Sequence, residues 1–256
     1  MQPKWLHFCL PRTEPCTATP TRFSVINIGH SQIKLLFEIY NVLKGVVESG
    51  SAGSGNGVYN QRVSSNKFII GIDEVGRGAL AGPVLVSAVM IPKSINLNFK
   101  KLPKLKDSKK LTAAYRETWF EFIKNHPKIY YATARVNPRV IDRINITKAA
   151  NRAATNAFKR LDVGKGTRVL LDGGLFLNTD YAFTRTIIKG DEKINAIKLA
   201  SIVAKVTRDR YMVKLHESYP LYNLAKHKGY GTRKHIRAIR RHGPSDIHRL
   251  TFINGL

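Results

Sequence analysis

The sequence predicts an α/β fold in which strands alternate with helices. Two observations lead to this prediction. The chain has 256 residues, 43% of them hydrophobic, which is enough to bury the core of one sizeable domain. From Lys67 onward, short apolar runs typical of strands alternate with longer segments whose apolar residues recur at helical spacing. We therefore expect one domain over residues 67–256.

The first 66 residues are expected to form a poorly ordered N-terminal extension to this domain. Glu48–Asn66 alternates glycines with serines, a composition typical of flexible linkers. Before it, Gln32–Val47 has apolar residues at helical spacing, which predicts one amphipathic helix. Because no candidate catalytic residue precedes residue 67, residues 1 to about 64 are expected to be dispensable for catalysis.

The domain is expected to begin with a β-hairpin. Phe68–Ile72 and Pro83–Ile91 are apolar runs joined by a glycine-rich turn. Thr112 is a suitable cap for a helix that runs to Asn125. Lys128–Val136 then alternates in the manner of a strand.

The second half of the domain continues this alternation. A long helix is expected from about Pro138 to Leu161, followed by strands at Arg168–Asp172 and Tyr181–Ile188. A last long helix is expected from about Ile194 to Ser218. It carries small residues on one face, which favours close packing against a neighbour: Ala196, Ala200 and Ala204.

The charge of the chain indicates a polyanionic partner. Lys and Arg number 43 against 17 Asp and Glu, giving a formal net charge of +26. Such a surface repels itself unless it normally meets a polyanion, and nucleic acid is the first candidate. The longest largely apolar run, Ala79–Ile91, is too short to cross a bilayer and contains Gly82 and Pro83, so no membrane partner is expected. We expect a soluble, cytoplasmic protein.

Acidic residues stand at the ends of predicted strands, where they are candidate metal ligands. Buried charge is costly unless a positive group compensates it. Because neighbouring strand ends can converge at one sheet edge, these acids would offer four hard oxygen donors, suited to Mg²⁺ or Mn²⁺. The four residues are Asp73, Glu74, Asp172 and Asp191.

Asp73 and Glu74 are adjacent, which sets a geometric condition. Adjacent side chains of a regular strand point to opposite faces, so both carboxylates cannot reach one metal cluster from ideal extended backbone. We therefore predict a strand end or a bulge at this point. Gly76 and Gly78 would supply the backbone angles for a tight exit.

Six motifs, in order, resemble those of the ribonuclease HII family. The resemblance covers roughly residues 67 to 252, and six ordered motifs are far more specific than any one of them. The sequence departs from the family at Lys198 and Leu199, where Ser or Ala is usual, which affects only the expected local packing. The motifs are Gly71-Ile-Asp-Glu-Val-Gly-Arg-Gly78, Leu105-Lys-Asp-Ser-Lys-Lys-Leu111, Leu171-Asp-Gly173, Lys189-Gly-Asp191, Ala200-Ser-Ile-Val-Ala-Lys-Val-Thr-Arg-Asp209 and His227-Lys-Gly-Tyr-Gly-Thr232.

The resemblance implies a ribonuclease H-like fold, with a central mixed β-sheet flanked by helices and a helical C-terminal part. It implies an endonuclease that hydrolyses the RNA strand of RNA/DNA hybrids by a two-metal-ion mechanism with Mn²⁺ or Mg²⁺. It also implies cutting on the 5′ side of ribonucleotides embedded in duplex DNA, with 5′-phosphate and 3′-hydroxyl ends. Such an enzyme would act in ribonucleotide excision during DNA replication and repair, and we expect a monomer.

Two sets of site residues follow from the resemblance. In the family, a glycine-arginine-glycine turn and a tyrosine grip the nucleotide at the RNA-to-DNA junction. Asp209, in mid-helix between Arg208 and Arg210, is expected to form a local ion pair outside the active site. The metal-binding catalytic residues would be Asp73, Glu74, Asp172 and Asp191, and the nucleic-acid-binding residues would be Gly76, Arg77, Gly78, Lys109 and Tyr230.

Other functions fit parts of the sequence. Gly76–Ala81 matches a dinucleotide-binding fingerprint, but the acids before it would repel a pyrophosphate, and Pro83–Met90 is expected to be a strand where that motif needs a helix. A noncatalytic basic RNA-binding protein would share the positive charge but has no use for acids pointed at phosphate. Five of the eight histidines fall in the last 41 residues, without the spacing of a zinc site.

Overall fold

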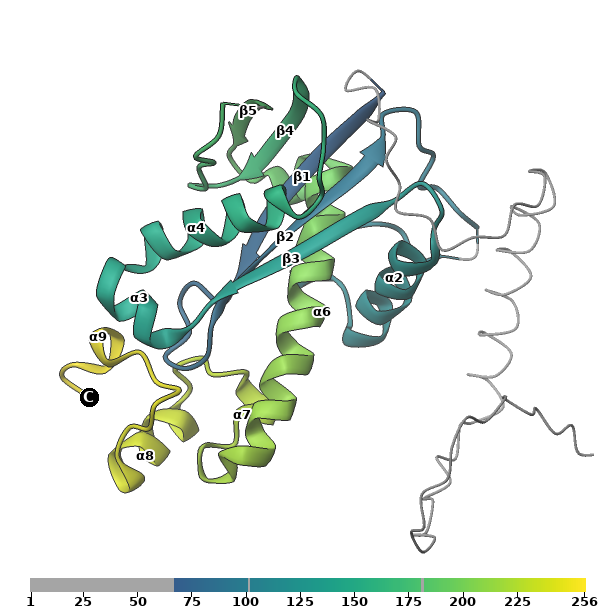
Figure 1. The fold of residues 1–256 in the computed structure, drawn as a ribbon. Helices are drawn as coiled ribbons and strands as arrows, with labels where there is room; N and C mark the ends of the chain where they lie inside the picture. The colour runs from purple at the N-terminus through teal and green to yellow at the C-terminus, as the bar shows by residue number, and fades with distance from the viewer. Residues whose placement is uncertain (1–66, 101, 181) are drawn as a thin grey trace, which may run out of the picture. The chain divides into compact units, whose positions relative to one another are not determined.

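The computed structural model describes residues 67–100, 102–180 and 182–256 (Figure 1). Within them, one five-stranded sheet has the strand order β3-β2-β1-β4-β5 and carries helices on both faces. The predicted N-terminal extension, including the helix expected at Gln32–Val47, lies outside the described residues. In the described part of the chain, no helix combines the length and the apolar character needed to cross a membrane.

The sheet combines antiparallel and parallel pairs. β1 (Phe68–Val75), β2 (Val84–Pro92) and β3 (Tyr130–Val136) are antiparallel neighbours. β4 (Thr167–Asp172) pairs in parallel with β1, and β5 (Ala182–Ile187) pairs in parallel with β4. The predicted hairpin and α/β fold are confirmed. Because β1, β4 and β5 run in one direction, their carboxyl ends share an edge, where ligands commonly bind in open α/β sheets.

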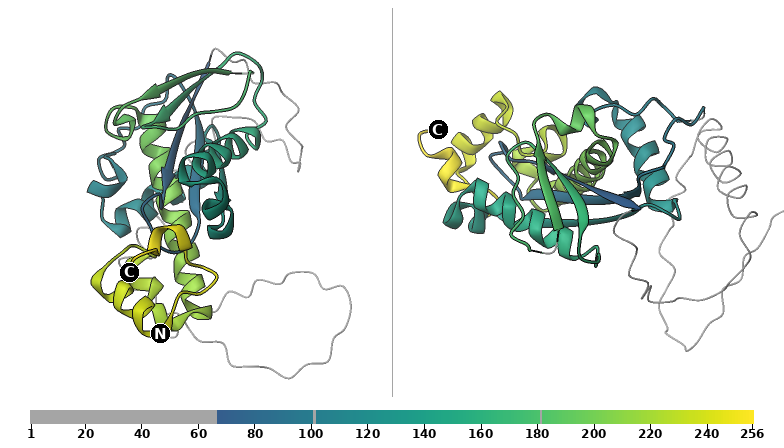
Figure 2. Two further views of the ribbon diagram at one scale, coloured as in Figure 1. Left: turned by 90° about the vertical axis from the view of Figure 1, so that its left-hand side faces the viewer. Right: turned by 90° about the horizontal axis from the view of Figure 1, so that it is seen from above.

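Helices cover both faces of this sheet (Figure 2). On one face, α4 (Ile146–Lys159) buries its alanines against the strands. On the other, α2 (Ala113–Asn125) and α6 (Asn195–Ser218) pack on the sheet and on each other. The shorter elements are η1 (Ser108–Lys110), α3 (Pro138–Ile144), α5 (Gly190–Lys193), η2 (Pro220–Tyr222), α7 (Leu224–His227), α8 (Arg233–His242) and α9 (Leu250–Ile253).

The long helix predicted from Pro138 to Leu161 is instead two helices, so that prediction is wrong. Asn145 separates them, with a φ of 66° that no helical residue adopts. Its side chain accepts a hydrogen bond from the amide of Lys148 and so caps α4. Asn tolerates the left-handed region better than most residues. The apolar spacing continues across Asn145, which is why the sequence pattern did not indicate the break between the two helices.

α6 approaches β1 closely at Gly71. A Cβ at this position would lie 2.2 Å from the backbone carbonyl carbon of Ala196. Ala196, Ala200 and Ala204 are all buried, as predicted for a close-packing face. The contact sets α6 directly against the strand that carries Asp73.

β1 remains regular up to Val75. Its residues pair one to one with those of β2 along its whole length, so of the strand end or bulge predicted at Asp73 and Glu74, no bulge forms and the strand ends at Val75, one residue after Glu74. Pairing with β4 stops at Ile72, which leaves the last residues of β1 unpaired on that side. Gly76, with a φ of 84°, then turns the chain towards β2. A strand thus follows where a dinucleotide fingerprint needs a helix.

The C-terminal part packs as a helical cluster at the end of α6, coloured yellow in Figure 1. Two isolated β-bridges tie it to the turn after β1, joining Ala79 to Tyr230 and Ala81 to His248. The predicted helical C-terminal part is confirmed. Its buried core consists of Ala81, Met212, Tyr222, Leu224, Ile239, Ile247 and Ile253.

Candidate active site

Three carboxylates meet at the carboxyl ends of β1 and β4. One oxygen each of Asp73, Asp172 and Asp191 lies within 4.8 Å of the other two. Asp73 belongs to β1, and Asp172 is the last residue of β4. Asp191 does not end a strand as predicted but lies in the first turn of α5, because Lys189, with a φ of 54°, turns the chain after β5.

Local structure holds these acids together. Side chains alternate along β1, and Gly71, two residues before Asp73, faces α6, so Asp73 also points to the α6 face. Oδ1 of Asp172 accepts hydrogen bonds from the amides of Gly190, at 2.6 Å, and Asp191, at 3.3 Å. These two bonds fix α5 to the end of β4 and bring Asp191 into the cluster.

Burial makes the charge of this cluster costly. The residues Asp73 and Asp191 are only 5% and 6% exposed. Burial, followed by the charge of Glu74, raises the pKa of Asp73 well above its ordinary value, although a hydrogen bond from Ser201 opposes the increase. Burial and the charge of Asp191 raise the pKa of Asp172. A bound cation would offset both causes, since it favours the charged form of each acid.

Glu74, the fourth predicted ligand, stands beside these three acids rather than among them. Alternation along the regular strand turns it to the face opposite Asp73. Its Oε1 lies 3.3 Å from Nη1 of Arg77, and its buried Oε2 has no hydrogen-bond partner. Burial raises the pKa of Glu74, and the charge of Arg77 opposes the increase. A buried carboxylate oxygen without a partner is costly, and a cation would satisfy it.

η1 adds a serine and a lysine next to the cluster. The hydroxyl oxygens of Ser108 and Ser201 are 2.7 Å apart, and Ser201 also hydrogen-bonds to Asp73. Either hydroxyl can donate the hydrogen bond between the two serines. Nζ of Lys109 lies 3.4 Å from Oδ2 of Asp191, and 80% of its side chain is exposed. Both serines lie inside sequence motifs, yet nothing in the sequence indicated their role.

Two buried arginines hold the turn that follows β1. Arg208 and Arg249 are both fully buried, and each donates hydrogen bonds to three backbone carbonyls. A Cβ at Gly76 would lie 2.1 Å from Nε of Arg208, so this position has no room for a side chain. Sequence reasoning missed both arginines, since a single Arg in so basic a chain gives no sign of burial. Arg208 donates to Ala81, Pro83 and Lys228, and Arg249 donates to Gly76, Arg77 and Gly82.

The outer side of this turn is accessible. Nη2 of Arg77 donates to Oγ1 of Thr147 at 3.1 Å, and 38% of the Arg77 side chain is exposed. Gly78 is exposed, and a Cβ added there would meet nothing within 4 Å. The turn therefore offers a free backbone and a partly free guanidinium next to Glu74.

Tyr230 lies beside the same turn. Its backbone forms the bridge with Ala79, and Leu80 donates its amide proton to the carbonyl of Gly229 at 2.8 Å. The half-buried ring has the guanidinium carbon of Arg208 5.4 Å from its centroid and Nζ of Lys205 at 5.9 Å. The chain thus brings together two motifs that lie about 150 residues apart in sequence.

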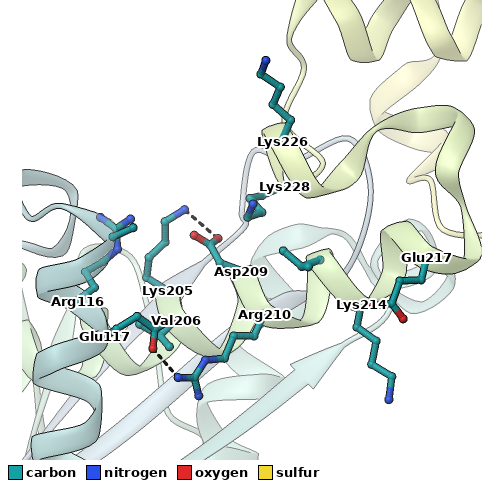
Figure 3. Close-up of a pocket in the computed structure, with 12 residues that line it drawn as sticks. Arg116, Glu117, Lys205, Val206, Asp209, Arg210, Lys214, Glu217, Lys226 and Lys228 are labelled. Carbon is teal, nitrogen blue, oxygen red and sulfur yellow. Dashed lines mark hydrogen bonds and ion pairs between the residues drawn. The ribbon is translucent and has the colours of Figure 1, made fainter. Parts of the chain in front are cut away.

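A charged groove runs along α6 between α2 and the segment that contains α7 (Figure 3). Six basic and three acidic side chains line it. Lys205 Nζ lies 3.0 Å from Asp209, and Arg210 pairs with Glu117. The local ion pair predicted for Asp209 is confirmed, with Lys205 as its partner. The remaining basic side chains are Arg116, Lys214, Lys226 and Lys228.

This basic groove adjoins the candidate site at two points. Lys205, in its wall, reaches over the ring of Tyr230. Arg116, also in its wall, donates to the carbonyl of Ser108, the residue before Lys109. Through these contacts the walls of the groove touch the ring of Tyr230 and the backbone next to Lys109.

Comparisons with known proteins agree on one family. The family model described as Ribonuclease HII matches residues 70–255. A Ribonuclease HII of Caldicellulosiruptor bescii is 44% identical over 190 residues, which cover 74% of this chain and 88% of the relative. One of Coxiella burnetii is 42% identical over 191 residues, which cover 75% and 91%. The crystal structure of ribonuclease H2 from Pyrococcus horikoshii matches with a TM-score of 0.55 and 25% identity, covering 72% of this chain and 93% of that one.

Proposed function

The chain belongs to the ribonuclease HII family, and on that premise we propose that Asp73, Asp172 and Asp191 are where it hydrolyses the RNA strand of RNA/DNA hybrids. Family membership makes it a ribonuclease H, an endonuclease that breaks phosphodiester bonds. The observation that supports this site is the convergence of three carboxylates in a chain with a net charge of +26. In a noncatalytic RNA-binding protein, acids that face phosphate would only weaken the affinity for RNA.

The donor set fits Mg²⁺ or Mn²⁺. It consists of carboxylate oxygens, the ligands that hard divalent cations prefer. Asp73, Asp172 and Asp191 would hold the metal, and the unpartnered Oε2 of Glu74 offers a fourth donor at its side. A metal held by these residues would supply a water of lowered pKa and positive charge for the departing oxygen.

The groups of the chain itself orient these ligands. The amides of Gly190 and Asp191 hold Asp172, and Ser201 holds Asp73. Because these partners belong to α5 and α6, the carboxylates are held in place before a substrate arrives. Lys109 places a mostly exposed ammonium at the rim, where it would contact a phosphate of the strand to be cut.

The turn after β1 and Tyr230 are proposed to recognise the ribonucleotide. The 2′-hydroxyl is what distinguishes RNA from DNA at a nucleotide, and reading it requires a close approach to the sugar. The open space at Gly78 permits that approach, with Gly76 forming the tight turn behind it. Arg77 offers a cation to the phosphate, and the ring of Tyr230 offers a surface for stacking.

The basic groove is proposed to hold the remainder of the duplex. Its lysines and arginines would bind phosphates without regard to base sequence. The partners are then RNA/DNA hybrids and DNA duplexes that contain ribonucleotides. One chain supplies all of these residues, so the site needs no second chain. The monomer and the cytoplasmic location stay predictions.

Mapping of the cut in a duplex with one ribonucleotide tests this function. We expect one cut on the 5′ side of the ribonucleotide, leaving a 3′-hydroxyl and a 5′-phosphate. End-labelled strands on a sequencing gel, with and without phosphatase treatment, show both the position and the ends. An all-DNA duplex of the same sequence should stay intact. Cutting of that control at a similar rate, or 3′-phosphate ends, would count against the proposal.

A further inference from the structure

Three histidines of the C-terminal part form one cluster that has no part in the metal chemistry. The ring of His227 stacks on that of His235, with centroids 4.4 Å apart. Nε2 of His235 lies 3.3 Å from Nε2 of His248, and both residues are buried. Burial lowers the pKa of His235 to about 4 and also lowers the pKa of His248, so both rings are neutral at neutral pH.

The surrounding hydrogen bonds fix the tautomer of each ring in the pair. The amide of Ser245 donates to Nδ1 of His248 at 3.0 Å, so the proton of His248 is on Nε2. Nε2 of His248 therefore donates to Nε2 of His235. That leaves the proton of His235 on Nδ1, which donates to the carbonyl of Tyr230 at 3.0 Å. One directed chain of hydrogen bonds thus ends on the backbone of Tyr230.

The backbone before Tyr230 is irregular. Lys228 and Gly229 have φ angles of 53° and 82°, so neither a helix nor a strand holds this part of the backbone. The carbonyls of Lys228 and Gly229 are held from outside the segment, by Arg208 and by the amides of Leu80 and Ala81. The Tyr230 carbonyl accepts from the Thr232 amide, a bond within the segment. The bond from His235 instead ties the carbonyl to α8 and, through His248, to the segment that bridges Ala81.

We propose that His235 is a positioning residue for ribonucleotide recognition, because its Nδ1–H holds the Tyr230 carbonyl and so keeps the ring beside the Gly76–Gly78 turn. This proposal rests on the recognition role proposed above for Tyr230. His235 is buried, so it acts only through Tyr230. Its loss should therefore reduce the rate of cutting and leave binding through the basic groove largely unchanged.

Two substitutions separate the two hydrogen bonds of the ring. In His235→Asn, the side-chain amide takes the place of Nδ1 and keeps the bond to Tyr230. In His235→Gln, the amide reaches the place of Nε2 and keeps the bond to His248 instead. We expect His235→Gln to lower kcat on the single-ribonucleotide duplex by up to about 100-fold, the effect of displacing a positioned group by about 1 Å, with KM close to wild type. His235→Asn should keep kcat within a small factor of wild type. Equal losses in the two variants, or no loss in either, would overturn the proposal.

Tyr230→Ala, measured in parallel, distinguishes the two proposals. Wild-type cutting by Tyr230→Ala would reject the recognition role itself. A loss in Tyr230→Ala without a loss in His235→Gln would reject only the positioning role of His235. If His235→Gln does not fold, the imidazole ¹⁵N spectrum of the wild-type protein still tests the hydrogen bond on which the positioning role depends. It should show His235 protonated on Nδ1 and His248 on Nε2, and the opposite tautomer of His235 would contradict the proposal.

Discussion

Asp73→Asn and Asp172→Asn are each expected to abolish cleavage of an RNA/DNA hybrid while hybrid affinity stays near wild type. Each substitution keeps the shape of the side chain but removes a charged donor from the cluster of three acids. A loss of at least about 100-fold is expected, because removing one preorganised electrostatic group has that effect on a transition state. The rate is measured under single-turnover conditions in Mg²⁺, and affinity by fluorescence anisotropy. Affinity should persist because the basic groove, rather than the acids, binds the duplex.

These variants should fold without difficulty. Burial and the charge of Glu74 already disfavour the charged form of Asp73, so replacing it with a neutral side chain should not destabilise the metal-free protein. Asp162→Asn is the matched control, since Asp162 lies in the loop before the amino end of β4, whereas Asp172 is at the carboxyl end of that strand, and the Asp162 φ of 48° suits Asn. It should cut at the wild-type rate. Near wild-type cleavage by a folded Asp73→Asn or Asp172→Asn would remove that carboxylate from the metal centre.

Tyr230→Ala is expected to reduce cutting at a single embedded ribonucleotide by about tenfold to a hundredfold, the range of a lost stacking contact. The ring lies beside the turn that carries Gly76 and Gly78, and the substitution removes the ring while leaving the backbone bridge to Ala79. The protein should stay folded, because the ring is only half-buried. kcat/KM on the single-ribonucleotide duplex is the quantity to measure, with the melting temperature as a check on folding.

Tyr230→Phe is the matched variant, because it keeps the ring and removes only the hydroxyl. If stacking dominates, it should cut nearly as well as wild type. If it cuts as poorly as Tyr230→Ala, the hydroxyl carries the interaction instead. Unchanged cutting by Tyr230→Ala would exclude Tyr230 from the recognition site.

The sequence predicted most of the fold because its apolar periodicity and its caps act locally. The hairpin, the helix capped by Thr112 and the long helix that ends at Ser218 all appear where they were expected. The convergence of Asp73 with Asp172 was also predictable, since each stands at or near the carboxyl end of a strand and the two strands are parallel neighbours. In these cases a local pattern and a simple rule of sheet geometry suffice.

Features that depend on tertiary contacts could not be predicted from the sequence. The break at Asn145 depends on one residue in the left-handed region, which leaves the apolar pattern intact. Arg208 and Arg249 are buried because their donors satisfy carbonyls of a distant turn, and no local pattern marks that role. A strand end or a bulge at Asp73 and Glu74 was predicted from the assumption that all four acids share one centre, whereas regular pairing continues to the strand end at Val75 and leaves Glu74 to the side.

Removal and return of metal test the central claim most directly. Wild-type protein treated with excess chelator is mixed with a hybrid whose RNA strand is labelled at one end and whose DNA strand is labelled with a second dye. We expect both strands to stay intact until Mg²⁺ or Mn²⁺ is added, after which only the RNA strand is cut, since the acid cluster gathers oxygen donors for such a cation. Cutting of the RNA strand in excess chelator, or an intact RNA strand with either ion present, would contradict the assignment of this cluster as the metal centre of a ribonuclease H.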